Sequence, residues 1–184
     1  MDGSGDPCLH RNVAMVTYRL RPLEPGDLAV LLSWENDPAH WIAGQRTSPF
    51  SKDTLEKYIA ASGRDFWETG QMRWVLCEAY ADRPLGLIDV FGAKRLHLRA
   101  EVGILIAPEM RGQGLARAGM HLLQAWARDY AMLETLSAQV YTDNTAALAT
   151  FNQAGFTRSG TWKRWVKTPQ GWKDVALFQW SPDR

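Results

Sequence analysis

The sequence has 184 residues, the length of one ordinary domain. Its 46% hydrophobic and 22% charged residues are typical of a folded protein and exclude a disordered or fibrous chain. Its 21 Lys and Arg balance 20 Asp and Glu, so charge gives no reason to expect a nucleic-acid or membrane partner. The two cysteines make neither a disulfide framework nor a zinc motif, and no apolar stretch approaches the roughly 20 residues that span a bilayer.

The beginning of the chain is polar, carries glycine and proline, and has no apolar signal region. We therefore expect a flexible N-terminus over residues 1–13 and a cytoplasmic protein. No linker or repeat follows, so we expect residues 14–184 to form a single domain.

Apolar and β-branched runs bounded by turn residues predict about seven strands, at residues 16–20, 73–80, 85–91, 100–107, 135–141, 156–166 and 172–180. Helical spacing of apolar residues predicts four helices, which begin near Asp27, Ser51, Leu115 and Thr145. Asp27 and Ser51 are the expected N-caps of the first two. For the long third helix, we expect an apolar surface that ends with Trp126 and Tyr130. The elements predict an α/β (α+β) fold with a mixed, largely antiparallel sheet and helices on both faces.

Two glycines lie between the strand at 100–107 and the long helix. Gly112 and Gly114 let the backbone approach an anion, and the free N–H groups and dipole of a helix start attract phosphate oxygens. Arg111 adds a cation beside them. The loop is neither a Walker loop nor a dinucleotide motif, and two glycines before a helix are common, so an ordinary loop is the alternative.

The run Arg111-Gly112-Gln113-Gly114-Leu115-Ala116 resembles the acetyl-CoA motif of the GNAT superfamily. Farther along, Asn144, Ala147, Phe151 and Gly155-Phe156 resemble the second motif of that superfamily. The order of predicted elements agrees over nearly the whole chain. Residues 20–28 and 171–175 resemble the branch that holds ribosomal-protein Nα-acetyltransferases and spermidine N-acetyltransferases.

The resemblance implies direct transfer of an acetyl group from acetyl-CoA, as co-substrate, to a primary amine, with no metal. Ile104, Leu105 and Ile106 would pair with pantetheine through their backbone, and a backbone N–H would polarise the thioester carbonyl. Asn144 would bind pantetheine from the other side, and Phe151 would pack against it. The pyrophosphate would be wrapped by Arg111, Gly112, Gln113, Gly114, Leu115, Ala116 and Arg117.

Many members of the superfamily place a tyrosine seven residues after the asparagine, where it protonates the leaving thiolate. This chain has Phe151 there, and a phenyl ring has no proton to give. Tyr141 is the nearest other hydroxyl, with ordinary aromatic packing as the alternative. A thiolate that leaves unprotonated is a further option, and a coenzyme A-binding module with little turnover is the corresponding alternative function.

Two carboxylates are candidates for the base that deprotonates the amine. Glu101 begins the strand that would bind the cofactor, and Asp89 lies in an apolar run. Burial would raise the pKa of Asp89, which suits a base, whereas a position on a solvated face would make it an ordinary surface residue. His40 lies in a predicted loop and is a weaker candidate.

Trp34 and Trp41 bracket the turn after the first helix and are the predicted acceptor-binding residues, because aromatic walls hold alkyl chains and cations. Core packing is the alternative, and it is the favoured one for most other tryptophans. Glu35 and Asp37 could pair with ammonium groups, but the loop beyond them carries Arg46 and no acid. This slightly favours a protein N-terminus or an amino sugar over a polyamine. An antibiotic acceptor and a homodimer are left open.

Overall fold

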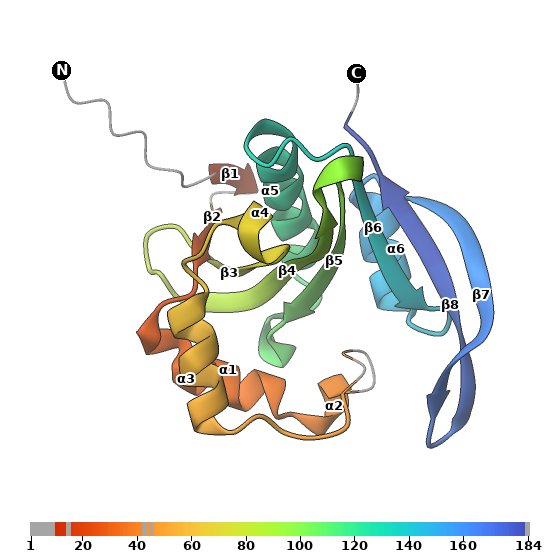
Figure 1. Ribbon diagram of the computed structural model, residues 1–184, viewed down its shortest axis with the longest axis horizontal. Coiled ribbons are helices and arrows are strands. Elements are labelled where there is room, and N and C mark those ends of the chain that lie inside the picture. Colours follow the sequence, from red (N-terminus) through yellow and green to blue (C-terminus); the bar gives the residue numbers. More distant parts are fainter. Residues whose placement is uncertain (1–9, 14–15, 42–43, 45, 183–184) are drawn as a thin grey trace.

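The structure is a computed structural model that describes residues 10–13, 16–41, 44 and 46–182. One sheet has the strand order β1-β2-β3-β4-β5-β6-β8-β7 (Figure 1). Its strands are β1 His10–Val13, β2 Val16–Pro22, β3 Met72–Glu78, β4 Pro84–Lys94, β5 Arg99–Ile106, β6 Thr135–Tyr141, β7 Thr157–Thr168 and β8 Gly171–Trp180. Neighbouring strands are antiparallel except β5 and β6, which are parallel.

This arrangement confirms the predicted mixed, largely antiparallel sheet. Strand β1 was not predicted: it pairs with β2 and lies within the segment expected to be flexible, while residues 1–9 lie outside the described part of the chain. Four residues of backbone pairing therefore extend the sheet from about seven strands to eight.

Helices lie on both faces of the sheet, as predicted. Among the described residues they are α1 Leu28–Glu35, α2 Pro38–Trp41, α3 Lys52–Ala61, α4 Phe66–Thr69, α5 Leu115–Asp129 and α6 Thr145–Gln153, with the 3-10 turns η1 Pro25–Asp27, η2 Arg95–His97 and η3 Pro108–Met110. Side chains of α5 and α6 join the larger core cluster, and those of α1 and α3 pack on Val75 and Leu87 across the sheet. No helix in the described ranges is both long and apolar enough to cross a bilayer.

The first residues of α3 and α1 show which of the two predicted N-caps forms a capping hydrogen bond. Ser51 caps α3 as predicted, since its Oγ accepts from the N–H of Thr54 at 3.1 Å. Asp27 occupies the N-cap position of α1 but makes no side-chain cap bond to it. Its carboxylate instead turns back to the N–H of Glu24 at 2.8 Å and to both terminal nitrogens of Arg21 at 2.7 and 2.8 Å.

The long helix α5 buries Leu115, Leu122 and Leu123 against the sheet, in agreement with its predicted apolar surface. Tyr130 was also expected on that surface, but it is 61% exposed. The helix ends at Asp129 and Tyr130 is its C-cap, so the helical periodicity no longer applies there.

Candidate active site

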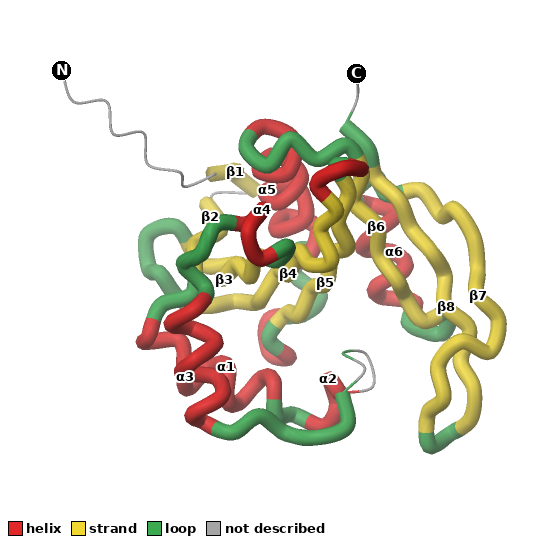
Figure 2. The backbone as a smooth tube through the Cα atoms, in the orientation of Figure 1, coloured by secondary structure: helices red, strands yellow, loops and turns green. Residues whose placement is uncertain are grey.

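Strands β5 and β6 separate along their length. They pair only at Arg99 with Thr135, Ala100 with Leu136 and Glu101 with Ser137, after which the two strands diverge (Figure 2). Beyond that point, β5 keeps its pairing with β4 on one edge and faces the gap with the other.

The antiparallel pairing of β4 and β5 determines which backbone groups of β5 point into the gap. The N–H of Ala107 donates to the carbonyl of Leu85 at 3.0 Å, and alternate residues of such a strand turn their N–H and C=O groups in opposite directions. The backbone of Ile104 and Ile106 therefore faces the gap, and that of Leu105 faces β4. A ligand lying in the gap meets a backbone edge able to accept and donate hydrogen bonds.

The loop after β5 has the form that an anion requires. Gly112 and Gly114 have φ of +77° and +76°, and an added Cβ at either would meet no protein atom within 4 Å. Gly114 is the N-cap of α5, whose first turn carries no acidic residue. The N–H groups at the start of a helix, here those of Leu115 and its successors, have no carbonyl one turn earlier to bond. The loop has the free donors and the space that a pyrophosphate needs.

Arg111 connects this loop to helix α2. Its Nε donates to the carbonyl of Ile106 at 3.2 Å, and its terminal nitrogen lies 2.8 Å from Nε2 of His40. The Nδ1 of His40 lies 2.9 Å from the carbonyl oxygen of Trp34. A carbonyl only accepts, so Nδ1 carries the proton and Nε2 accepts from Arg111. This position of His40 was not predictable from sequence, because its partner Arg111 is 71 residues away.

Asn144 is the N-cap of α6 and Phe151 lies within that helix, which follows β6, the strand on the other side of the gap from β5. The Oδ1 of Asn144 accepts from the N–H of Ala147 at 3.1 Å, which starts the helix and leaves the side-chain amide N–H groups outside the cap. Phe151 is buried, with its ring centroid 5.1 Å from that of Phe156 and 5.9 Å from that of Phe178. The phenyl ring is thus a core residue, and its contact with a cofactor stays a prediction.

Asp89 is not the isolated carboxylate that its apolar neighbours suggested. Its oxygens accept from Nε and a terminal nitrogen of Arg73 at 2.5 and 2.9 Å, and a third nitrogen of Arg73 donates to Glu35 at 2.5 Å. Burial lowers the pKa of Arg73, but the two carboxylates raise it further, so this pKa lies above its ordinary value. Asp89 thus matches neither alternative that the sequence left open, a buried base or an ordinary surface residue, because Arg73 on β3 lies directly opposite it and binds it.

Glu101 lies at the last paired position of β5 and β6, where the gap opens. One carboxylate oxygen accepts from Nε2 of Gln139 on β6 at 3.0 Å. Gln139 thereby orients a candidate base, a role that the sequence did not suggest. The other oxygen of Glu101 has no hydrogen-bond donor among the described residues.

Tyr141 is the last residue of β6, beyond Gln139 on the same strand. Burial and the nearby Asp143 raise its pKa above the ordinary value of about 10. Its hydroxyl therefore holds its proton at neutral pH, as a general acid must. The Nζ of Lys173 lies 5.5 Å from the ring centroid.

The predicted acceptor residues lie on α1 and α2. Trp34 is partly buried against the cluster of α1 and α3, and Nε1 of Trp41 donates to the carbonyl of Glu35 at 3.0 Å. Asp37 accepts from the N–H of Ala39 at 2.9 Å, so its carboxylate begins α2. Both carboxylates that were weighed as ammonium partners are thus already engaged, Glu35 by Arg73 and Asp37 by the backbone.

The model of the acetyltransferase (GNAT) domain family matches residues 18–157. The chain belongs to the GNAT acetyltransferase family and is an acetyl-CoA-dependent N-acetyltransferase, which confirms the resemblance seen in its two motifs.

Individual relatives agree with this assignment. Spermidine N(1)-acetyltransferase of Vibrio cholerae serotype O1 is 26% identical over 145 residues, which cover 77% of this chain and 79% of the relative. The enzyme of the same name from Escherichia coli K12 is 25% identical over 151 residues, covering 78% and 75%. A crystal structure of spermidine N-acetyltransferase from Vibrio cholerae in complex with CoA and spermine has a TM-score of 0.80 at 23% identity, covering 89% and 95%, and confirms the fold.

Proposed function

We propose that this chain acetylates a primary amine of a linear polyamine such as spermidine. The observation that carries the proposal is the similarity of more than three quarters of the chain to two spermidine N(1)-acetyltransferases. The reaction would take place in the cytoplasm, in keeping with the free thiol of Cys77, and within a single domain over residues 14–184.

The charges around the gap support a cationic acceptor. Glu35 and Asp89 share one guanidinium, that of Arg73, so this cluster carries a net charge of −1. Arg46, the cation that weighed against a polyamine in the sequence, lies over the ring of Phe50 at 3.2 Å and donates to the carbonyl of Ser48. The guanidinium of Arg46 therefore contacts residues of its own loop, which weakens the preference for an acceptor of lower charge that the sequence suggested.

Two side chains at the gap would carry out the two proton transfers, one from the ammonium group and one to the leaving sulfur. Bound acetyl-CoA would supply the acetyl thioester that the amine attacks. Glu101 would remove the proton from the ammonium group through a water molecule, because its second oxygen has no donor among the described residues, whereas both oxygens of Asp89 are held by Arg73. The N–H of Ile104 would polarise the carbonyl, and Tyr141 Oη would donate a proton to the sulfur.

The residues that would hold acetyl-CoA lie on both sides of the gap. Ile104 and Ile106 would offer their backbone to pantetheine on one side, and the amide of Asn144 would meet it on the other. The loop from Arg111 to Gly114 and the first N–H groups of α5 would hold the pyrophosphate.

The proposal is tested by measuring initial rates of thiol release with the full-length chain, acetyl-CoA and an amine panel. The panel holds spermidine, spermine, butylamine, an amino sugar and a peptide with a free N-terminus, and mass spectrometry identifies each product. We expect kcat/KM for the polyamines to exceed that for butylamine by at least about tenfold, since a second ammonium adds roughly 1.4 kcal/mol or more. A preference for the peptide or the amino sugar would refute the polyamine, and no turnover with any amine would favour the coenzyme A-binding module.

A further inference from the structure

Two tryptophans of β7 pack against each other at the surface. The ring centroids of Trp162 and Trp165 lie 4.3 Å apart with 39° between their planes, and the residues are 37% and 52% exposed. In a regular strand, residues three positions apart point to opposite faces of the sheet. Here the pairing with β8 shifts register between Trp162 and Val166, and this bulge brings both rings to one side.

The bulge is held by specific contacts and costs backbone strain. Arg164 has φ of +50°, in the left-handed region that residues other than glycine seldom adopt. Asp174 fixes it by accepting from the N–H of Arg164 at 2.8 Å and from Nζ of Lys163 at 2.7 Å. The guanidinium of Arg164 lies 5.7 Å from the ring of Trp172. Strain maintained in this way, together with two exposed indoles, is typical of a functional surface.

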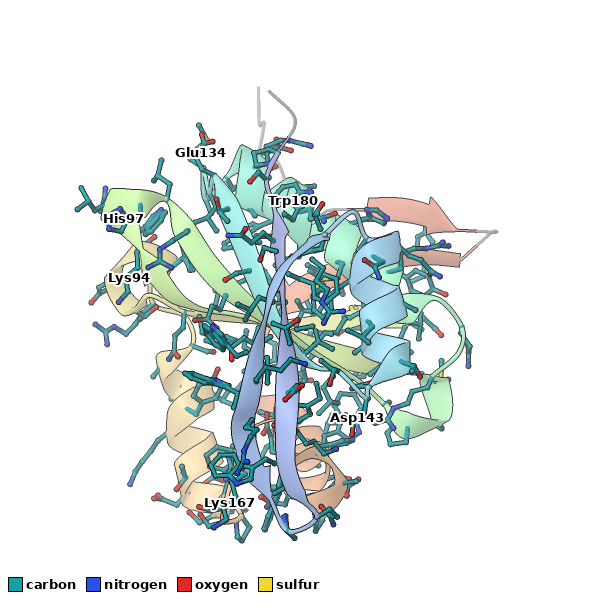
Figure 3. All side chains as sticks on the ribbon, turned by 90° about the vertical axis from the view of Figure 1, so that its right-hand side faces the viewer. Lys94, His97, Glu134, Asp143, Lys167 and Trp180 are labelled. Atoms are coloured by element: carbon teal, nitrogen blue, oxygen red, sulfur yellow. The ribbon has the colours of Figure 1, made fainter. Side chains whose placement is uncertain are left out.

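Cross-strand pairing relates this aromatic pair to Tyr141, with β8 lying between β7 and β6. Trp162 pairs with Val175, and Val175 pairs in turn with Tyr141. Directly paired residues of neighbouring strands share a face of the sheet, so Trp162 and Tyr141 lie on the same face. The adjacent residue of β8, Ala176, belongs to the core on the side of α6. In Figure 3, α6 lies along one side of β7 and β8, and no helix of the described ranges lies directly against the other.

We propose that Trp162 and Trp165 form the acceptor subsite, where their rings hold the alkyl chain and distal ammonium of the polyamine. This inference rests on the proposed function. The cations of the bulge do not compete for the rings, since Asp174 binds Lys163 and the side chain of Arg164 lies over Trp172. The indole faces remain for a cation carried by the substrate, which tryptophan binds better than other aromatic residues.

The experiment compares Trp165→Ala with Tyr130→Ala. Trp165 is 52% and Tyr130 61% exposed, and Tyr130 lies at the end of α5, so Tyr130→Ala controls for removal of a surface aromatic ring. For Trp165→Ala we expect KM for spermidine to rise about three- to thirty-fold, as loss of a cation–π contact predicts, with kcat and coenzyme A affinity within twofold. Trp165→Phe should recover most of the loss, and KM for butylamine, which lacks a distal ammonium, should change less.

An unchanged KM in Trp165→Ala, or an equal rise in Tyr130→Ala, would overturn the subsite. A failure of the proposed function gives a different result, because the wild-type protein then does not acetylate spermidine. In that case the same variants are compared on whichever amine of the panel turns over, and a KM within twofold of wild type for Trp165→Ala again overturns the subsite. Where no amine turns over, spermidine is titrated into the coenzyme A complexes of wild type and Trp165→Ala. The subsite is then overturned if spermidine changes the intrinsic tryptophan fluorescence of both proteins equally or of neither.

Discussion

Two carboxylates face the region where the acceptor amine would lie, and their partners differ. Asp89 gives both oxygens to Arg73, which also binds Glu35 and so ties α1 to the sheet. Glu101 gives one oxygen to the neutral amide of Gln139. A carboxylate held by a guanidinium is a structural ion pair, whereas one oriented by an amide keeps an oxygen for proton transfer.

We therefore predict that Glu101→Gln lowers kcat/KM by roughly 10²–10⁴-fold. Asp89→Asn should keep most of the activity and instead lower thermal stability, because it leaves a buried guanidinium with one carboxylate fewer. Initial rates on the preferred amine, together with thermal unfolding of both variants, check this. A wild-type rate for Glu101→Gln would remove Glu101 as the base.

Local sequence was enough to locate the residues that are proposed to act through their backbone. Gly112 and Gly114 were found because a strand, two glycines and a helix in succession are visible in a short window. The partners of side chains were not visible in this way. Arg73 pairs with Asp89 across a hairpin, and His40 meets Arg111 from 71 residues away, so only the folded sheet brings them together.

At the scale of elements, the end of β2 is fastened to η1 by a buried ion pair. Arg21 and Asp27 are 8% and 5% exposed and share two hydrogen bonds. Burial raises the pKa of Asp27, but the bonds from Arg21 and from the N–H of Glu24 lower it more, so the folded-state pKa lies below the ordinary value. A carboxylate with a lowered folded-state pKa stabilises the fold above its unfolded pKa of about 3.9, and this contribution is lost as the pH falls through the folded value.

We predict that Asp27→Asn lowers the free energy of unfolding by about 3 kcal/mol at pH 7, since it leaves Arg21 without its buried partner. The difference from wild type should shrink below about pH 4 as Asp27 itself becomes protonated. Urea unfolding at pH 7, 5 and 3.5 measures it. Asp129→Asn is the control, because Asp129 pairs with Arg128 at the surface and its loss should leave the midpoint unchanged. A difference that stays constant with pH would contradict the ion-pair account.

The elements themselves were largely predictable, because apolar periodicity and turn residues are local. Strand β6 and helix α6 have the predicted bounds, and Ser51 caps α3. The bulge in β7 was not predictable. Strict alternation would send Trp162 and Trp165 to opposite faces, and the register shift depends on Asp174 in the neighbouring strand.

At the scale of the molecule, the sheet gathers the functional groups at one place. The gap opens where β5 and β6 diverge, and the N-terminus of α5 follows the loop after β5. Tyr141 and Trp162 lie on one face of the sheet, on the β6 side of the gap. The helices α1 and α3 cover the other end of this face over β3 and β4. With the proposed function, one sheet therefore carries the sites that would hold the pyrophosphate, the reacting groups and the acceptor.

The account depends most on the loop at Gly114 being the coenzyme A site, and calorimetric titration of coenzyme A into Gly114→Leu tests this. Gly171→Leu, in the turn between β7 and β8, is the control, because both glycines have positive φ and an added Cβ at either meets no protein atom within 4 Å. We predict that Kd rises at least about thirty-fold in Gly114→Leu, a loss of roughly 2 kcal/mol, and stays within twofold of wild type in Gly171→Leu. Wild-type affinity in Gly114→Leu would contradict the account.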